Sequence, residues 1–243
     1  MFQEVIDKLY RRQDLTVAEA EATMSEVMEG RATPAQIAGV LVGLAMKGER
    51  PSEIVGLART MRAHAVKPSR LFDDTFDTCG TGGDGSYTFN VSSLAAIVLA
   101  ACGVRVAKHG NRSVSSKCGS ADLFEALGVA VTASPNVVEH CLQEVGIAFF
   151  FAPTFHPSMR HAAPTRRELG VRTAFNLLGP LTNPCAAGRQ LLGVWGDSFV
   201  EPMAEALRIG GTTKSVVVHS HDGLDEISIS APTRMMFIDG GGL

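Results

Sequence analysis

The stretch "DTCGTGGDGSYTFNVSS", Asp77 to Ser93, decides the fold class. It begins at the end of a segment typical of a β-strand, contains four glycines and leads into the helix-like segment "VSSLAAIVLAACG". A glycine-rich loop between a strand and a helix N-terminus exposes backbone N–H groups that suit a phosphate or pyrophosphate. The loop matches neither the dinucleotide fingerprint nor the P-loop, so a plain tight turn remains the alternative.

Short strands and helices alternate around this stretch. Segments typical of strands cover residues 74–80, 104–110, 147–153, 189–196 and 214–221. Segments typical of helices cover residues 91–103, 120–128, 134–146 and 198–211. The alternation indicates an α/β domain over residues 72–243 with a mostly parallel central sheet. Ligands of such sheets bind beyond the carboxyl ends of the strands, where the glycine-rich stretch lies.

Residues 1–66 are typical of helices only, so we expect a small N-terminal all-helical subdomain. Thr16 can cap one helix, Thr33 followed by Pro34 can open a second, and a third follows Pro51. Residues 38–46 are apolar on nearly every face. We therefore expect this helix either between other helices or in a subunit interface.

A second polar loop, "KHGNRSVSSKCGSAD", runs from Lys108 to Asp122. It follows its own strand, so its cationic side chains would lie beside the glycine-rich loop and offer a second anion-binding element. A loop of this composition can also be simply solvated. The combination with many small residues favours the anion-binding interpretation.

An acidic pair, Asp225 and Glu226, follows the last expected strand in "HSHDGLDEISI". Mg²⁺ prefers one or two carboxylates together with substrate phosphates and waters. Two neighbouring acidic residues are also common in turns. Beside two phosphate-type loops, magnesium is the favoured interpretation.

Composition indicates a globular protein of one or two domains. The 243 residues are 45% hydrophobic and 19% charged, with a formal net charge of −3, which gives no general attraction to nucleic acid or an anionic membrane. The N-terminus does not resemble a signal peptide and no segment resembles a membrane span, so the cytoplasm is the expected location. The five scattered cysteines predict reduced, mostly buried thiols.

The motifs "CGTGGDG", "NVSS", "KHGNRSVSSKCGSAD", "TRRELGVRTAFNLLGPLTNP" and "GLDEIS", in this order, resemble anthranilate phosphoribosyltransferases. The resemblance covers nearly the whole chain. It implies a Mg²⁺-dependent transfer of the phosphoribosyl group from 5-phosphoribosyl 1-diphosphate (PRPP) to the amine of anthranilate, with release of pyrophosphate, in tryptophan biosynthesis. The implied fold is nucleoside phosphorylase/phosphoribosyltransferase-like, and the implied assembly is a homodimer through the helical subdomain.

The resemblance also implies roles for individual residues. The residues matched to PRPP binding are Gly80, Gly82, Gly83, Asp84, Thr88, Asn90, Ser92, Ser93, Lys108 and Ser120. Those matched to anthranilate are Gly80, His109, Asn111, His156, Arg166 and Pro180, and those matched to magnesium are Ser92, Asp225 and Glu226. Lys108, Asn111 and Arg166 would act most directly in catalysis.

Two further expectations follow from the resemblance. The helical segment 165–185 would join the helical subdomain in space. Members of the family continue beyond "MMFIDGGGL" with further strands and helices, so the α/β part is expected to be incomplete at its C-terminal side, with exposed apolar faces.

The implied chemistry agrees with these residues. The aromatic amine is a neutral nucleophile and the reacting ribose carbon develops positive charge, so charge neutralisation and positioning are the main tasks. Arg166 can grip the anthranilate carboxylate with two hydrogen bonds. Its alternative is a surface arginine on "PTRRELG", where Arg167 is expected to face solvent.

Two other functions stay open at this stage. A pyrimidine nucleoside phosphorylase would share the fold and the phosphate loops, although "HGNR" and "GPLTNP" speak against it. A non-enzymatic nucleic-acid-binding relative would be basic and would not need the acidic pair.

Overall fold

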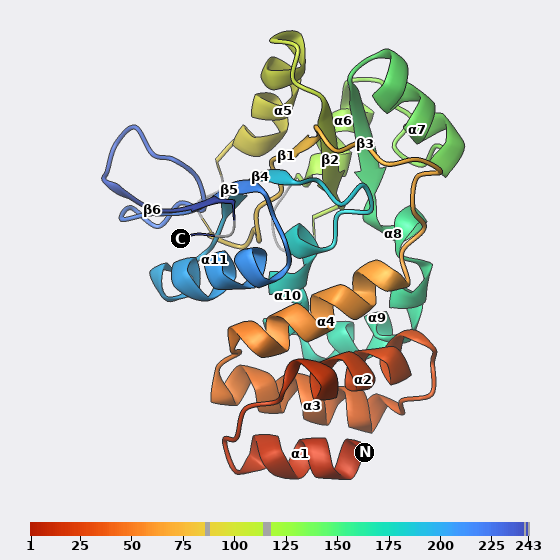
Figure 1. Cartoon of the computed structure of the whole chain (residues 1–243), viewed down its shortest axis with the longest axis vertical. Coiled ribbons are helices and arrows are strands. Elements are labelled where there is room, and N and C mark those ends of the chain that lie inside the picture. The colour runs from red at the N-terminus through yellow and green to blue at the C-terminus, as the bar shows by residue number, and fades with distance from the viewer. Residues whose placement is uncertain (86–87, 114–117, 241, 243) are drawn as a thin grey trace.

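The computed structural model describes residues 1–85, 88–113, 118–240 and 242. Figure 1 shows two parts, a bundle of helices that contains the N-terminus and a sheet flanked by helices. The fold class expected from the sequence, a small helical part followed by an α/β part, is confirmed.

Four helices form the N-terminal bundle: α1 (Phe2–Tyr10), α2 (Val17–Met28), α3 (Pro34–Lys47) and α4 (Pro51–Ala63). The predicted starts of three of them are confirmed. Thr16 Oγ1 accepts a hydrogen bond from the Glu19 backbone N–H at 3.2 Å, and Thr33 Oγ1 accepts one from the Gln36 N–H at 3.3 Å. Each bond satisfies a donor that a helix N-terminus otherwise leaves unpaired.

The apolar helix α3 lies between other helices, one of the two expected arrangements. On one side its Gly39 and Gly43 allow α1 to approach closely, since a Cβ at Gly43 would lie 3.0 Å from Leu9 Cβ. On the other side α3 packs against α9 (Ala163–Leu169) and α10 (Ala174–Leu178).

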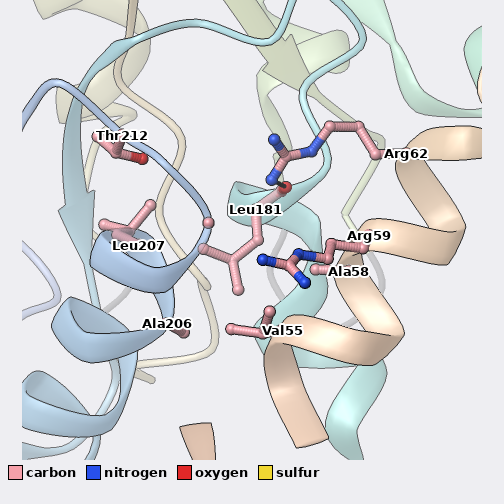
Figure 2. Close-up of a pocket in the computed structure, with 9 residues that line it drawn as sticks. Val55, Ala58, Arg59, Arg62, Leu181, Ala206, Leu207 and Thr212 are labelled. Atoms are coloured by element: carbon pink, nitrogen blue, oxygen red, sulfur yellow. Dashed lines mark hydrogen bonds between the residues drawn. The ribbon is translucent and has the colours of Figure 1, made fainter. Parts of the chain in front are cut away.

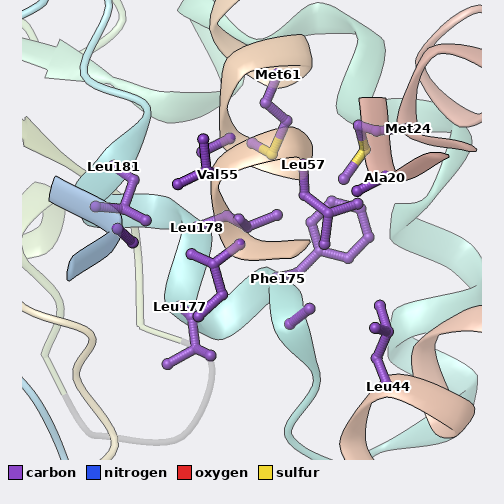
Figure 3. Close-up of a cluster of buried hydrophobic side chains, with 14 of the residues drawn as sticks. Ala20, Met24, Leu44, Val55, Leu57, Met61, Phe175, Leu177, Leu178 and Leu181 are labelled. Atoms are coloured by element: carbon purple, nitrogen blue, oxygen red, sulfur yellow. The ribbon is translucent and has the colours of Figure 1, made fainter. Parts of the chain in front are cut away.

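The segment after the third strand of the sheet returns to the helical bundle. Figure 3 shows Phe175 and Leu178 of α10 packed among Leu57 and Met61 of α4 and Met24 of α2. Burial of large side chains stabilises a fold by roughly 1.5–3 kcal/mol each, so this packing ties α10 to the bundle. The packing supports the interpretation that segment 165–185 belongs spatially to the helical subdomain.

The α/β part is built on a six-stranded sheet with the order β3-β2-β1-β4-β5-β6. Its strands are β1 (Phe76–Asp77), β2 (Val106–Gly110), β3 (Ile147–Phe151), β4 (Arg189–Gly193), β5 (Lys214–Ser220) and β6 (Thr233–Asp239). All neighbouring pairs are parallel except β5 and β6. The predicted mostly parallel sheet is therefore confirmed.

Helices cover both faces of this sheet. In Figure 1, α5 (Val91–Ala101) lies above the strands and α11 (Val200–Ile209) lies below them. The helix α6 (Ser120–Ala126) packs through Phe124 against Phe149 and Phe151 of β3. The helix α7 (Pro135–Glu144) packs through Val138 and Leu142 near Phe150, on the opposite face of the same strand. The short elements α8 (Ala152–Phe155), η1 (Pro157–His161), η2 (Gly179–Leu181) and η3 (Asp197–Phe199) complete the connections. Because β2 and β4 flank β1 on opposite sides, the chain reverses its winding between β1 and β4, and ligands bind at such a switch point.

Two arginines of α4 contact later segments of the chain beside the helical bundle (Figure 2). Arg62 Nη2 donates to the Leu181 carbonyl at 2.9 Å, and Arg59 Nη2 donates to the Ile209 carbonyl at 3.2 Å. The cavity between them has a volume of ≈ 10 Å³. That is room for about one water molecule, so this junction is a structural contact and not the substrate site.

Three details differ from the sequence expectations or extend them. The strand expected at 74–80 is limited to Phe76–Asp77, because the chain then leaves the sheet to form the loop. None of the five cysteines forms a disulfide, but only Cys79 and Cys185 are buried, so the expectation of mostly buried thiols is wrong. Apolar side chains are exposed on α5, where Leu94 and Val98 are 41% and 62% exposed.

Candidate functional site

The carboxyl ends of β1, β4 and β5 meet at the switch point of the sheet. The Thr81 N–H in the glycine loop after β1 donates to the carbonyl of Gly193 at the end of β4, at 2.9 Å. A Cβ on Gly193 would lie 1.6 Å from the Asp225 carbonyl oxygen, which follows β5. No side chain fits at Gly193, so this glycine permits the backbones of two strand ends to touch.

The glycine loop turns through conformations that favour glycine. The φ angles of Gly82 and Gly83 are +65° and +78°, a region in which a Cβ causes strain. The N–H of Gly82 donates to Asp225 Oδ2 at 2.9 Å. The loop therefore turns a backbone donor toward an anionic group, as an anion-binding loop requires.

The acidic pair lies against this loop and against the N-terminus of α5. Glu226 Oε1 accepts a hydrogen bond from the Ser92 N–H at 3.2 Å. Burial and the neighbouring Asp84 raise the pKa of Asp225 to about 6, and burial and Asp225 raise the pKa of Glu226 to about 7. Three carboxylates thus repel one another at one place, and a cation there would relieve the repulsion.

These residues fit magnesium bound together with a substrate. Among the residues that the structure describes, no cluster of three or more His, Cys, Asp or Glu side chains could hold a metal ion. A site made of Asp225 and Glu226 needs further oxygen ligands, and Mg²⁺ commonly takes these from substrate phosphates and water. Ser92, the predicted hydroxyl ligand, lies next to the acidic pair, because its backbone N–H donates to Glu226.

The raised pKa values predict how the stability of the metal-free protein depends on pH. A carboxyl whose pKa is higher in the folded state than in the unfolded chain binds its proton more tightly when folded, so its contribution to stability falls as pH rises through about 6 to 7. The variant D225N/E226Q is therefore expected to melt about 3–6 °C above the wild type at about pH 8 without metal. The difference should shrink toward about pH 5, as calorimetry can measure. A constant difference across this range would contradict the expectation.

A buried polar network fixes the strand ends that carry Lys108 and His109. Asp77, the last residue of β1, accepts hydrogen bonds from the His109 N–H at 3.2 Å and from Asn183 Nδ2 at 2.7 Å. Burial raises the pKa of Asp77. Lys108 is 2% exposed and its Nζ donates to the Thr78 carbonyl at 3.1 Å. The network places a cation beneath the glycine loop.

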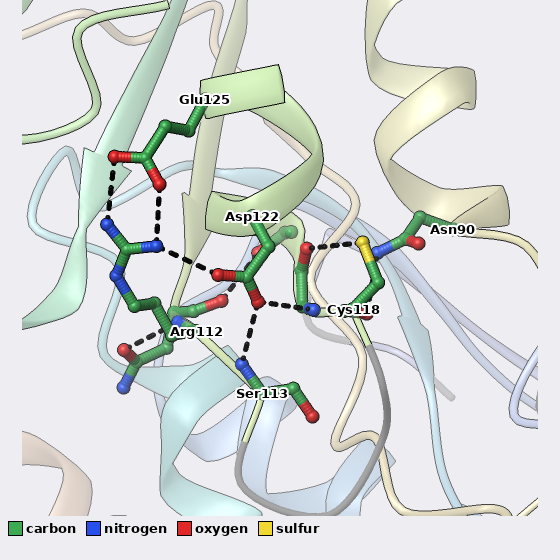
Figure 4. A network of polar contacts seen from close by, with 9 residues as sticks. Asn90, Arg112, Ser113, Cys118, Asp122 and Glu125 are labelled. Atoms are coloured by element: carbon green, nitrogen blue, oxygen red, sulfur yellow. Dashed lines mark hydrogen bonds and ion pairs between the residues drawn. The ribbon is translucent and has the colours of Figure 1, made fainter. Parts of the chain in front are cut away.

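Ion pairs clamp the second loop to α6, as Figure 4 shows. Arg112 Nη1 contacts Asp122 Oδ1 at 2.9 Å and Glu125 Oε2 at 2.7 Å. Asp122 Oδ2 in turn accepts hydrogen bonds from the N–H groups of Ser113 and Gly119, at 3.3 and 2.8 Å. Arg112 and Asp122 therefore hold both ends of the loop, whose residues 114–117 lie outside the described residues.

Two neutral histidines lie next to each other in the interior. The rings of His109 and His156 have centroids 5.2 Å apart and are tilted by 56°. Burial lowers the pKa of His109 to about 3 and that of His156 to about 4. Because His109 Nδ1 lies 3.1 Å from the Gly179 carbonyl, which can only accept, Nδ1 carries the proton and Nε2 is an acceptor. Both Nε2 atoms are buried without a partner among the described residues.

Arg166 lies over the ring of Phe175, with Cζ 4.7 Å from the ring centroid. Burial lowers its pKa. Within the described part of the chain its guanidinium takes part in no hydrogen bond or ion pair, whereas most other arginines have carboxylate or carbonyl partners. An arginine fixed by a ring and lacking an anionic partner is suited to bind a carboxylate.

The structure places the two loops expected at the substrate site next to each other. Ser120 Oγ donates to the Asn111 carbonyl at 3.3 Å, and Asn90 Nδ2 donates to the Cys118 carbonyl at 3.2 Å, so both expected loops are linked. The Ser93 hydroxyl is buried without a partner among the described residues. Thr88 lies at the exposed edge of the glycine loop. The sequence interpretation did not assign roles to Arg172 and Trp195, which also lie beside this loop.

Family models cover most of the chain. The model described as "Glycosyl transferase family, helical bundle domain" matches residues 3–65, and the one described as "Glycosyl transferase family, a/b domain" matches residues 73–243. No helix in the described ranges has the length and apolar character needed to cross a bilayer.

Curated relatives are similar over the whole chain. Anthranilate phosphoribosyltransferase from Syntrophobacter fumaroxidans is 54% identical over 99% of this chain, and that from Moorella thermoacetica is 52% identical over 100% of it. The chain covers 72% of the length of each of these relatives.

Solved structures agree with these relatives. Anthranilate phosphoribosyltransferase from Thermus thermophilus superposes with a TM-score of 0.89 at 48% identity, covering 96% of this chain and 70% of that one. The enzyme from Saccharomyces cerevisiae in complex with PRPP and Mg gives 0.88 at 25% identity, covering 98% of this chain and 72% of that one.

Proposed function

The chain belongs to the anthranilate phosphoribosyltransferase family, and we propose that its strand-end loops hold PRPP against anthranilate. The reaction transfers the phosphoribosyl group to the amine of anthranilate and gives N-(5-phosphoribosyl)anthranilate and pyrophosphate, in tryptophan biosynthesis. Magnesium is the metal of this reaction.

The PRPP side of the site consists of the glycine loop, the N-terminus of α5 and Lys108. The proposed contacts are Gly80, Gly82, Gly83, Asp84, Thr88, Asn90, Ser92, Ser93, Lys108 and Ser120. Backbone donors at positive-φ glycines, the positive end of an 11-residue helix and a Ser93 hydroxyl with no partner among the described residues support this assignment. Lys108, buried below them, adds the charge that favours a diphosphate.

Asp225, Glu226 and the neighbouring Ser92 would hold the magnesium. When bound there, Mg²⁺ would neutralise charge on the pyrophosphate group. The two carboxylates, whose pKa values are raised by burial and by neighbouring carboxylates, support this role. Asp225 also orients the glycine loop through Gly82, so the same residue serves the loop and the metal.

The anthranilate side consists of Arg166, the two histidines and the start of the second loop. The proposed contacts are Gly80, His109, Asn111, His156, Arg166 and Pro180. The guanidinium of Arg166, which has no hydrogen-bond or ion-pair partner in the described part of the chain, suits the carboxylate of the substrate. His109 Nε2 is a buried acceptor, and a substrate that carries an amine N–H can satisfy it.

The residues contribute to the reaction mainly by positioning and electrostatics. Anthranilate brings a neutral amine, and the bond to pyrophosphate breaks as the ribose carbon gains positive charge. Lys108 and the loop N–H groups stabilise the negative charge on the departing pyrophosphate. Arg166 and Asn111 hold the amine in place for attack, which can supply a large part of the rate enhancement. The chemistry needs no strong base, in agreement with the neutral histidines.

One observation carries the assignment: the acidic pair meets the glycine loop and the α5 N-terminus at the switch point of the sheet. Calorimetry should detect saturable PRPP binding that requires Mg²⁺ and is lost on chelation. Phosphorolysis of thymidine or uridine would instead favour the nucleoside phosphorylase. Salt-sensitive DNA binding without PRPP binding would favour the nucleic-acid-binding relative.

The remaining expectations about partners and location belong to the same proposal. We propose a cytoplasmic homodimer formed through the helical subdomain, with no nucleic-acid or membrane partner. Exposed apolar side chains on that subdomain support the dimer, since Tyr10 of α1 is 86% exposed and Met46 of α3 is 71% exposed. Light scattering of the purified chain tests it.

A further inference from the structure

Arg172 connects the two parts of the molecule at the glycine loop. It lies between Gly170, which ends α9 in a left-handed conformation, and Thr173, which caps α10. Its Nη2 donates to the carbonyl of Gly83, which lies 89 residues earlier in the chain. Because α9 and α10 pack against the helical bundle, this contact reaches from that bundle side to the proposed PRPP loop.

The contact belongs to a closed ring of interactions around the loop. The guanidinium of Arg172 lies over Trp195, with Cζ 5.1 Å from the ring centroid. The backbone N–H of Trp195 donates to Thr81 Oγ1 at 3.2 Å. Thr81 and Gly83 flank Gly82, so the ring holds the loop on both sides of the residue that contacts Asp225.

This restraint matters because glycine residues restrict the backbone of the loop only weakly. Gly82, Gly83 and Gly85 all have positive φ angles, and glycine takes either sign of φ at little cost. The peptide between Gly83 and Asp84 can therefore turn either way unless something fixes it. A planar trans peptide directs its C=O and its N–H in opposite directions, so the bond from Arg172 to the carbonyl turns the following N–H away from Arg172.

We propose that Arg172 is a positioning residue for the phosphoribosyl donor, which fixes the glycine loop by holding the Gly83 carbonyl while Trp195 holds the guanidinium in place. This inference rests on the proposed function, because it takes the loop N–H groups as ligands of PRPP. Arg172 acts through the loop and not as a direct phosphate ligand. Since it stands on the segment that also carries Arg166, it also connects the donor loop with the acceptor side.

The single tryptophan of the chain makes the proposal measurable without turnover. Trp195 contacts both the loop and Arg172, so its fluorescence should change when PRPP binds in the presence of Mg²⁺. In Arg172→Ala the emission of the free protein should shift to longer wavelength, because the indole loses its cover. The PRPP dissociation constant should rise about 10–100-fold, as expected for a lost hydrogen bond to a charged group.

Kinetics and a second substitution distinguish a positioning role of Arg172 from a direct contact between its charge and a phosphate of PRPP. Positioning predicts a raised KM for PRPP with kcat within about threefold and the KM for anthranilate unchanged. Arg172→Lys keeps the charge but cannot both stack flat on Trp195 and donate to Gly83, so it should recover little of the loss. Recovery to within about twofold of the wild type would indicate a direct phosphate contact and overturn the proposal.

Controls distinguish the proposed role of Arg172 from the proposed binding of PRPP by the protein. Arg234→Ala removes another exposed arginine, paired to Asp197 at 2.8 Å, and should leave PRPP binding unchanged. If the wild type binds PRPP and Arg172→Ala binds it equally well, the inference fails while the proposed function stands. If the wild type shows no PRPP binding, the proposed function fails. Melting curves check folding, and Trp195→Phe, titrated by calorimetry, gives an independent test with a smaller expected loss.

Discussion

Exchanging Asp225 and Glu226 together for Asn and Gln is expected to reduce turnover by about 10³-fold or more. The amides keep the shape and can still accept hydrogen bonds from Gly82 and Ser92. They remove the two negative charges that would hold magnesium. The loss should therefore appear in metal-dependent turnover while the fold remains intact, as steady-state rates over a magnesium titration can show.

A neighbouring aspartate provides the matched control. Asp222 lies in the same connection, is exposed and accepts a hydrogen bond from the Ser228 hydroxyl at 2.5 Å. Asp222→Asn should retain the wild-type rate and magnesium dependence. A double variant D225N/E226Q that kept the wild-type rate at limiting magnesium would show that the pair is not the metal site.

Replacing Arg166 by Ala is expected to raise the KM for anthranilate about 10–100-fold, because a hydrogen-bonded charge pair with the carboxylate is lost. The KM for PRPP should change by less than about twofold, since Arg166 lies on the acceptor side. Initial rates at varied concentrations of each substrate separate the two effects.

Arg167 is the control for this experiment. It follows Arg166 on α9 but is exposed, as expected from the sequence. Arg167→Ala should behave as the wild type. An unchanged anthranilate KM in Arg166→Ala, or equal effects of the two substitutions, would remove Arg166 from the anthranilate site.

Local chemistry made much of this fold predictable from the sequence. Thr16 and Thr33 cap their helices as expected, since a capping hydroxyl acts only on the first turn after it. The glycine loop was predictable for the same reason: the residues that shape it are consecutive. Parallel pairing followed from the alternation of strands and helices, and it alone placed the acidic pair near the glycine loop.

Contacts between distant residues were not predictable in this way. The bond between Asp77 and Asn183 joins residues 106 positions apart, and neither residue stands in a local pattern that indicates the other. The contact of Arg172 with the glycine loop was not predictable either, because Gly170 ends the helix before Arg172 and no helical spacing relates Arg172 to Arg166. The exposure of Cys102 and Cys118 depends on how α5 and the second loop lie in space.

Transferase activity is tested by following the fluorescence of anthranilate after the purified chain is mixed with PRPP and Mg²⁺. We expect a magnesium-dependent loss of anthranilate fluorescence, abolished by a chelator, with formation of N-(5-phosphoribosyl)anthranilate and pyrophosphate. Fluorescence that stays constant with both substrates and magnesium at saturation would contradict this expectation.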